Sequence, residues 1–493
     1  MNPGFIRPVA NAPLRRFYLL ASLSSVLAIP AGLHAASSTW SNSGGTDFQT
    51  AGNWSAGVPG VTGTSNTSNA DIATFGGTSV ANPNVSANWT LAQLLFNTTA
   101  SGYDITSTGG FSLRLNNSTS AIVAQNTSGT NTISSAIILG RNGSFQNFSQ
   151  AAGGTLIVNG KISSATTAGI NFLNSTTSPA GTTAEFQINN TANDFSGGAV
   201  IGTSGRNVKV SIKSLGNTGA AGSLGTGSII IGETGASSTV QTLNYTGAGE
   251  TSNKTITLRA SSNAANRRVI DTTGATGALK LSGSLVANDT SLSTETANVQ
   301  LSGSGTLGDE VTGVIGNGAG AGKVALIKAG AGTWTLSGNN TYTGTTTVSE
   351  GTLALGAANR IADASNLVLS GGTFATGGFG ETLGTLSLTA NSTIDLGSGA
   401  SALVFSASNG IAWTSLTTLN IVNFNTGTDS VRIGTSAAGL TETQLSQITI
   451  NGFEALIDSQ GYLSFAAIPE PSTYAVMLGG LALAGVMIRR RRC

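Results

Sequence analysis

Short hydrophobic runs, in which apolar and polar residues alternate, recur along the chain from about residue 81 to 467. Clusters of Gly, Asn and Ser separate the runs about every ten residues, a spacing typical of many short strands. Outside the termini the pattern keeps a helical period for no more than a turn or two, and the best helix candidate is Leu440–Ile448. The clearest runs predict strands at Ile137–Leu139, Thr155–Val158, Val208–Ile212, Ser228–Ile231, Thr255–Leu258, Leu367–Leu369 and Leu386–Leu388.

The segment Leu326–Leu355 shows the organisation most clearly. Glycines precede three predicted strands, Thr333–Leu336, Thr345–Val348 and Thr352–Leu355, and an Asn-containing turn follows the first of them. Three strands and three turns predict one coil of a β-solenoid and the start of the next coil.

Alternation within these strands predicts which side chains face the core. Leu336, Val348 and Leu353 are expected to point inward, while Thr and Ser point outward. The turn asparagines are expected to stack into side-chain ladders. With about 20–25 residues per coil, the body is expected to hold roughly 17–20 coils and to be about 80–95 Å long.

The same segment resembles a known repeat. The residues that carry the resemblance are Lys328, Gly330, Gly332, Leu336, Gly338, Asn340, Tyr342 and Gly344. Their spacing resembles the autotransporter-associated β-strand repeat, and a degraded copy stands at Asn193–Gly197. The resemblance implies an all-β fold, an elongated right-handed parallel β-helix (β-solenoid), in an exported passenger region.

The C-terminal stretch has three parts. Pro469, Glu470 and Pro471 form a rigid turn that blocks a helix on its N-terminal side. An uncharged apolar run follows and predicts a transmembrane helix over 472–488, about 25 Å long, against a bilayer core of about 30 Å. The chain then carries four arginines, Arg489, Arg490, Arg491 and Arg492, which favour the cytoplasmic side. The alternative is a buried C-terminal helix of a soluble domain.

This stretch resembles the PEP-CTERM sorting signal of Gram-negative bacteria. The triplet, the short apolar helix and the arginine cluster occur in the same order in both. The resemblance implies that the tail places the exported chain in the inner membrane, and that an exosortase-like transpeptidase cuts near the triplet. It also implies a final location at the cell surface or outside the cell.

The N-terminal 36 residues have the pattern of a signal peptide. Arg7, Arg15 and Arg16 form the basic region, and Phe17–Ile29 forms the apolar region. The protein-export machinery is therefore an expected partner. A retained N-terminal anchor is the alternative.

The motifs divide the chain into segments. We expect a signal peptide at 1–36, an N-terminal cap at 37–80, a solenoid body at 81–428, a C-terminal cap at 429–465, a linker at 466–468 and the sorting signal at 469–493. Large aromatic residues suit a cap over the first sheet edge. The alternative for Trp40, Trp54 and Trp89 is a carbohydrate-stacking site.

Charge and rare residues exclude several functions. The formal net charge is +1, but seven of the 22 basic residues lie in the two terminal segments, which leaves 15 against 21 acidic residues, a net charge near −6. Such a body argues against nucleic-acid binding. The only His is His34 and the only Cys is Cys493, so the body holds no Ser-His-Asp triad, His-ligated metal site or disulfide. No cofactor or metal is expected.

These observations favour a non-enzymatic protein, a structural or adhesive element of the cell surface or extracellular matrix, with extracellular polysaccharide as a partner. A carbohydrate-active β-helix enzyme, a polysaccharide lyase or glycosidase, is the first alternative. It requires several carboxylates that converge with Lys or Arg in one groove, whereas Asp309–Glu310 is the only adjacent acidic pair in the sequence. An autotransporter-like passenger protein is the second alternative.

Overall fold

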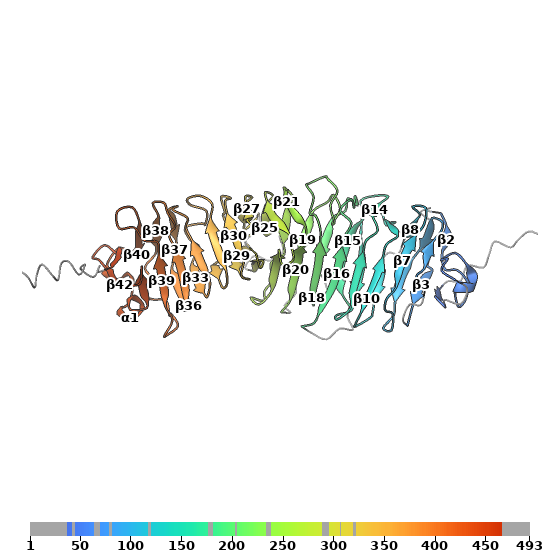
Figure 1. Cartoon of the computed structure of the whole chain (residues 1–493), viewed down its shortest axis with the longest axis horizontal. Coiled ribbons are helices and arrows are strands. Elements are labelled where there is room, and N and C mark those ends of the chain that lie inside the picture. Colours follow the sequence, from blue (N-terminus) through green and yellow to red (C-terminus); the bar gives the residue numbers. More distant parts are fainter. Residues whose placement is uncertain are drawn as a thin grey trace, which may run out of the picture.

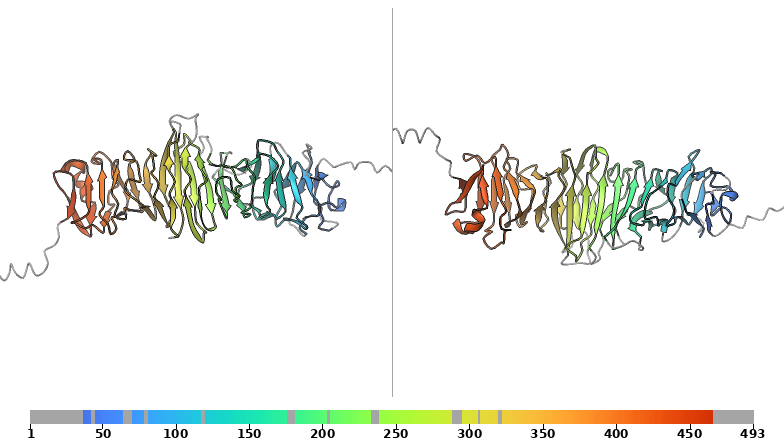
Figure 2. Two further views of the ribbon diagram at one scale, coloured as in Figure 1. Left: turned by 90° about the horizontal axis from the view of Figure 1, so that it is seen from above. Right: turned by 60° about the horizontal axis from the view of Figure 1, so that its bottom comes forward.

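The protein is a straight rod of stacked β-coils, with strands that run across its long axis (Figure 1). The computed structural model describes residues 37–465, apart from 42–44, 64–69, 78–80, 117–119, 176–180, 203–204, 233–237, 288–294, 306 and 319–321. The two further views show the same stacking from other sides (Figure 2). The fold is an all-β parallel solenoid of about 12 turns.

Each coil contributes strands to up to three faces of the rod. The first, here called the long face, is one 13-stranded parallel sheet. Its strands are β4 (Asn84–Val85), β7 (Asp104–Ser107), β10 (Thr130–Ile133), β13 (Thr155–Val158), β16 (Thr183–Ile188), β18 (Asn207–Ile212), β20 (Val240–Tyr245), β23 (Arg267–Asp271), β26 (Thr296–Ser302), β29 (Lys323–Lys328), β31 (Thr346–Val348), β33 (Leu367–Ser370) and β36 (Leu386–Ala390).

The second face is interrupted along the rod. Its first sheet has 11 strands: β1 (Ser37–Thr39), β3 (Ile72–Phe75), β6 (Gln93–Phe96), β9 (Ser120–Ala124), β12 (Phe145–Gln150), β15 (Gly169–Asn174), β17 (Ala199–Ile201), β19 (Ile229–Ile231), β22 (Ile256–Leu258), β25 (Leu285–Ala287) and β28 (Ile315–Gly316). A three-stranded sheet later takes the same place in the coil order: β35 (Glu381–Leu383), β38 (Ala402–Phe405) and β40 (Ser430–Ile433).

The third face is also built from two sheets. The first has five strands: β2 (Val61–Thr62), β5 (Trp89–Leu91), β8 (Ser112–Leu115), β11 (Ala136–Leu139) and β14 (Ile162–Ser164). The second has 11 strands: β21 (Ala248–Ser252), β24 (Gly277–Leu281), β27 (Asp309–Val311), β30 (Thr333–Leu336), β32 (Thr352–Leu355), β34 (Thr373–Ala375), β37 (Ser392–Asp395), β39 (Leu419–Val422), β41 (Ile448–Ile450), β42 (Phe453–Ile457) and β43 (Leu463–Phe465).

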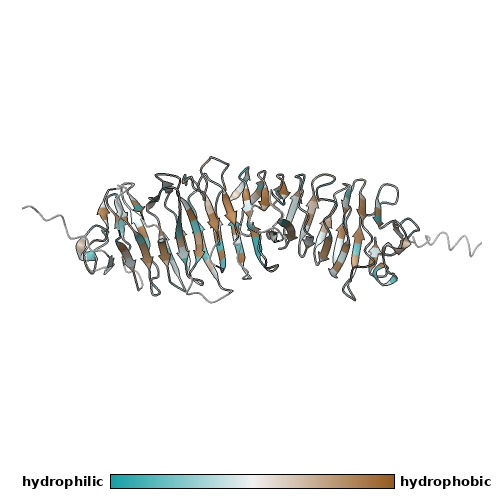
Figure 3. Cartoon of the chain, turned by 180° about the vertical axis from the view of Figure 1, so that it is seen from behind, coloured by the Kyte–Doolittle hydropathy of each residue, from teal (hydrophilic) through white to brown (hydrophobic). Residues whose placement is uncertain are grey.

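Alternating strand residues fill the interior. In β13, Leu156 and Val158 are fully buried, while Thr155 and Ile157, which alternate with them, are half-buried. Polar and apolar residues accordingly alternate along many strands (Figure 3). The predicted inward residues Leu336, Val348 and Leu353 are all fully buried, which confirms that prediction. The strands predicted from the hydrophobic runs are present to within one or two residues at their ends.

The number of coils differs from the expectation of 17–20, which is wrong. From β7 to β29, paired residues on the long face lie 24 to 33 positions apart, and we call these the variable coils. From β29 to β36 the separation is 19 to 21 positions, and we call these the repeat coils. Longer coils mean fewer of them, so about 12 turns at about 4.8 Å give a rod of about 60 Å.

Both ends of the described rod carry covering structure. At the N-terminal end, Trp40, Phe48, Trp54 and Phe75 pack together, with ring centroids 4.9 Å apart for Phe48 and Trp54. The 3₁₀ helix η1 (Ala51–Asn53) lies among them in the sequence. These are the residues of the predicted N-terminal cap, and the division into caps and body stays a proposal.

At the C-terminal end, the chain turns back on itself. Strands β41, β42 and β43 pair antiparallel, unlike the parallel ladders of the coils. The segment before them holds the 3₁₀ helix η2 (Ala437–Gly439) and helix α1 (Glu442–Leu445), and α1 lies within the predicted helix candidate Leu440–Ile448. Thr441 and Gln444 form a capping box that starts α1.

Several predicted segments lie outside the described residues. They are the signal peptide at 1–36, the linker at 466–468, the sorting signal at 469–493 and its transmembrane helix at 472–488. The longest helix in the described part, α1, has four residues, and no helix there is long and apolar enough to cross a membrane.

Candidate functional site

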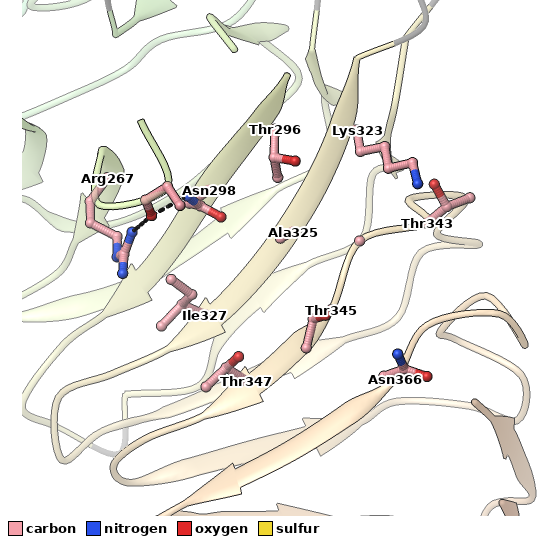
Figure 4. A pocket seen from close by; sticks show the side chains of 12 residues that line it. Arg267, Thr296, Asn298, Lys323, Ala325, Ile327, Thr343, Thr345, Thr347 and Asn366 are labelled. Carbon is pink, nitrogen blue, oxygen red and sulfur yellow. Dashed lines mark hydrogen bonds between the residues drawn. The ribbon is translucent and has the colours of Figure 1, made fainter. Parts of the chain in front are cut away.

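A groove of about 500 Å³ lies on the long face, at the junction between the variable and the repeat coils (Figure 4). Strands β23, β26, β29 and β31 and the segments just before β23, β31 and β33 contribute its lining residues. Five coils therefore build one surface. The lining residues are Ala264, Arg267, Thr296, Asn298, Lys323, Ala325, Ile327, Thr343, Gly344, Thr345, Thr347 and Asn366.

The strand register arranges these side chains in rows parallel to the rod axis. One row, here called the central row, contains the paired residues Asn298 and Ala325. Extending the register of the neighbouring ladders by one residue adds Arg267, Thr345 and Asn366 to it. At about 4.8 Å between strands, five members span about 19 Å. Thr296 and Lys323 form a parallel row two residues earlier on their strands. The groove therefore has the direction of the rod.

Ala325 gives the groove its depth. It lies in the central row between Asn298 and Thr345, and its two sequence neighbours, Val324 and Leu326, point into the core. Ala325 is 9% exposed because the taller side chains beside it rise above its methyl group. A small residue at the middle of a row of larger ones leaves a depression.

The charged residues of the lining are both cations. The Arg267 side chain is held in place, because its Nη1 donates to the carbonyl oxygens of Ala264 at 2.7 Å and Asn266 at 3.1 Å. Burial lowers the pKa of Arg267, but that pKa starts so high that the guanidinium stays charged. Lys323 is exposed at the other wall. None of the described lining residues is an acid.

A smaller hollow of about 250 Å³ adjoins the groove. Its lining shares Ala264 and Thr296 with the groove and adds Ser261, Ser262 and Glu295. The Glu295 Oε2 atom is buried without a hydrogen-bond partner. This single carboxylate is the one acid that the two hollows contain among the described residues.

Apart from Gly344, which lines the groove, the repeat signature residues lie outside it, and the large ones pack in the core. The fully buried Lys328 ammonium donates to the carbonyl oxygens of Ala329 at 2.9 Å, Gly330 at 2.6 Å and Glu350, in the next coil, at 3.0 Å. Burial lowers the pKa of Lys328 to about 8, and nearby Glu350 and Asp309 oppose that shift. The lysine therefore ties two coils together.

Asn340 does the same through its amide. Its Oδ1 accepts from the Ile315 N–H at 2.8 Å, and its Nδ2 donates to the Arg360 carbonyl at 2.8 Å. Ile315 begins β28, the last strand of the first sheet on the second face, and Arg360 lies in the next coil. The expected ladder of stacked Asn side chains is therefore wrong at this turn, because the Asn340 amide bonds to backbone groups. The side chain occupies the position that the next strand of that sheet would take.

The degraded copy uses the same arrangement. Asn193 Oδ1 accepts from the Ile162 N–H at 2.7 Å, and Nδ2 donates to the Ser223 carbonyl at 2.8 Å. Ile162 begins β14, the last strand of the first sheet on the third face. Phe195, two residues after the asparagine, is fully buried, as is Tyr342 two residues after Asn340. The motif therefore marks where a sheet ends.

Residues considered for catalysis or stacking are held elsewhere. Asp309 is buried and accepts from the Thr272 hydroxyl at 2.6 Å and the Leu279 N–H at 2.9 Å. Glu310, which alternates to the opposite side of β27, forms an ion pair with Lys280 at 3.0 Å. The described residues hold no group of three or more His, Cys, Asp or Glu arranged to bind a metal ion.

The three tryptophans are buried. Trp40 and Trp54 are each 4% exposed and Trp89 is 8% exposed. The indole nitrogens of Trp54 and Trp89 each donate to a backbone carbonyl at 2.7 Å. The alternative of a carbohydrate-stacking site on these residues is therefore wrong, since their ring faces are covered by protein.

The predicted sorting residues lie outside the described part of the chain: Pro469, Glu470, Pro471, Arg489, Arg490, Arg491 and Arg492. The sequence reasoning missed the groove completely. Its residues come from 264–366 and, apart from Gly344, lie outside the repeat signature. The only local signal was that cations are scarce and that Arg267 and Lys323 each stand at the start of a strand.

Comparison with known proteins gives two family matches and one relative. The passenger-associated-transport-repeat model matches residues 326–355, and the PEP-CTERM protein-sorting motif matches residues 467–492. The adhesin BmaC autotransporter of Brucella suis biovar 1 (strain 1330) is 34% identical over 157 residues, which cover 30% of this chain and 4% of that adhesin. No solved structure matches the chain. The chain thus combines a passenger-type repeat, on a parallel β-solenoid, with a C-terminal PEP-CTERM sorting motif.

Proposed function

We propose that this protein is an exported, non-enzymatic β-solenoid that serves as a structural and adhesive element at the cell surface or in the extracellular matrix. The observation that carries the proposal is the combination of a sorting motif at 467–492 with a rod of stacked parallel coils. We take the coil to be right-handed, as parallel β-crossovers almost always are.

The physics of the rod supports this use. Backbone ladders run along three faces, so each coil is bonded to its neighbours and the array is stiff. Many outward positions of the described strands are Thr, Ser or Asn, which offer weak hydrogen bonds and carry no charge. The similarity to a protein named as an adhesin supports the adhesive part of the proposal.

Export follows three steps in this proposal. The signal peptide at 1–36 directs the chain to the export machinery, and the helix at 472–488 holds it in the inner membrane with Arg489–Arg492 on the cytoplasmic side. An exosortase-type transpeptidase then cuts near Pro469–Pro471 and passes the body outward. The autotransporter-like passenger alternative shares the repeat at 326–355 and differs in the route of export.

The enzymatic alternative has one supporting feature, the unpartnered Glu295 Oε2 beside the groove. A glycosidase uses two carboxylates that flank the scissile bond. The described residues of the groove and its adjoining hollow supply one, so the geometry favours binding over cleavage.

The test of the proposed function is mass spectrometry of the C-terminal peptide of protein recovered outside the inner membrane. A terminus near Pro469–Pro471 on surface-exposed or released protein is the expected result. An intact tail that ends in Arg489–Arg492, on protein found only in the inner membrane, would contradict it.

A further inference from the structure

We propose that the groove on the long face binds a linear, negatively charged polysaccharide whose chain runs along the rod axis, with carboxylated sugars as the recognised units. This inference rests on the proposed function, which places the body among extracellular polymers. It adds the site, the direction of the bound chain and the charge of the ligand.

The shape of the groove selects a linear polymer. The central row spans about 19 Å across five strands, and the strand spacing of about 4.8 Å is close to the length of one sugar unit in an extended chain. A polymer aligned with the rod therefore meets a new side chain with each sugar.

The charge of the lining selects an acidic polymer. Arg267 and Lys323 are separated by two strand spacings and two residues along the strand, about 12 Å in all. This distance matches two carboxylates about two sugar units apart. Because the described lining adds no acid of its own, a neutral or basic chain would leave both cations without an anionic partner.

The remaining side chains suit the neutral parts of sugars. The groove offers the hydroxyls of Thr296, Thr343, Thr345 and Thr347 and the amides of Asn298 and Asn366. Ile327 provides an apolar contact for the carbon face of a ring. Hydroxyl and amide groups both donate and accept, as sugar hydroxyls require.

Arg267 is the anchor of the site. Its guanidinium is already held by the Ala264 and Asn266 carbonyls, so binding orders few additional side-chain torsions. Nη1 makes both of these bonds, which leaves donors on the other guanidinium nitrogen for a carboxylate. The exposed Lys323 then supplies a second charge without fixed geometry.

The test is calorimetric titration of the full chain with two probes, oligogalacturonate and its methyl ester. The ester keeps the sugar chain and removes the charge. We expect the acid to bind with an affinity that falls as salt rises, and the ester to bind at least tenfold more weakly. Failure of the wild-type chain to bind the acid, or equal binding of the ester, would overturn the inference.

Variants locate the site. We expect the double variant Arg267→Gln with Lys323→Gln to weaken oligogalacturonate binding at least tenfold, and Ala325→Phe to do the same by filling the depression. Lys209→Gln is the control, because Lys209 lies on the same face in β18, outside the groove, and should bind normally. Unchanged binding by the double variant would overturn the inference, and circular dichroism confirms that each variant keeps its β-structure.

Different outcomes would contradict the proposed function and the proposal of a polysaccharide-binding groove. Surface location is followed by the C-terminal peptide and cell fractionation, without reference to the ligand. Surface protein that binds neither probe removes the groove inference alone. Protein that binds oligogalacturonate and yet keeps its tail in the inner membrane removes the proposed function alone.

Discussion

The variable coils and the repeat coils both enclose a buried apolar core, but they use different numbers of residues per coil. A variable coil uses 24 to 33 residues and a repeat coil uses 19 to 21. The second face has no strand between β28 and β35, so the first two repeat coils lack one there, whereas the coil from β33 to β36 keeps β35 and is equally short. In the first repeat coil, a turn that buries Asn340 and Tyr342 takes the place of the strand.

The comparison teaches what the repeat signature encodes. Asn340 satisfies the backbone N–H of the last strand beneath it, and the tyrosine two residues later fills the core that a strand would otherwise cover. Asn193 and Phe195 act in the same way at another face of the variable coils. The signature therefore encodes a turn at which a sheet ends. The groove lies where the variable coils and the repeat coils meet.

The largest expected loss of stability comes from replacing the two buried aromatic residues with alanine. Tyr342→Ala and Phe195→Ala each remove a fully buried ring, and each should cost about 3–5 kcal/mol of local stability. Hydrogen exchange of the coils next to each site measures this, since a long array does not unfold as one unit. A large loss of stability at one site and none at the other would show that Tyr342 and Phe195 do not play the same role.

The stability of the repeat coils around Glu381 should depend on pH. Burial raises the pKa of Glu381 from 4.5 to about 7, although its bonds from the Arg360 and Ile361 N–H groups oppose the shift. Between these two values the folded protein holds the proton more tightly than the unfolded chain. The contribution of Glu381 to stability is therefore greatest below pH 4.5, and about 3 kcal/mol of it is lost as pH rises from 4.5 through 7.

Hydrogen exchange of peptides around Glu381, followed from pH 4 to 8 and corrected for intrinsic exchange rates, measures this loss. Glu381→Gln should remove the pH dependence, while Glu454→Gln, at an exposed position, should leave it in place. A loss of stability on acidification that depends on Glu381 would show that the sign is wrong.

The inter-coil amide bonds should give an intermediate effect. Asn340→Ala and Asn193→Ala each remove bonds to two neighbouring coils and leave a buried N–H unsatisfied, at a cost of about 2 kcal/mol. Thermal unfolding and local hydrogen exchange measure it. Asn339→Ala is the matched control, because Asn339 is the exposed neighbour, and an equal effect there would argue against the bridging role.

The smallest effect distinguishes the two aromatic residues. The Tyr342 hydroxyl bonds to Thr346 Oγ1 at 2.7 Å, and Thr346 bonds to Ser365 Oγ in the next coil at 2.9 Å. Tyr342→Phe should therefore cost about 1 kcal/mol. The opposite exchange, Phe195→Tyr, should cost at least as much, because it buries a hydroxyl in a space shaped for a ring alone. Thermal unfolding of both variants tests this, and a stabilising Phe195→Tyr would contradict it.

Much of the fold was predictable because strand formation is local. The strands at Thr155–Val158, Thr333–Leu336 and Thr352–Leu355 have the predicted bounds, since apolar alternation and flanking glycines determine them without reference to the rest of the chain. The coil count was not predictable, because it depends on how much chain passes between stacked strands. A regular repeat suggested about 20–25 residues for every coil, and most of the variable coils exceed that length.

The sequence alone determined that the chain is a β-solenoid with a sorting motif at its end, because alternation, turn residues and the C-terminal pattern are properties of neighbouring residues. Only the tertiary structure decided the groove. Arg267 and Lys323 lie in different coils, and the parallel register of β23, β26 and β29 brings them to one surface. Register depends on loop lengths and on bonds such as those of Asn340 between coils, and these are properties of the stack.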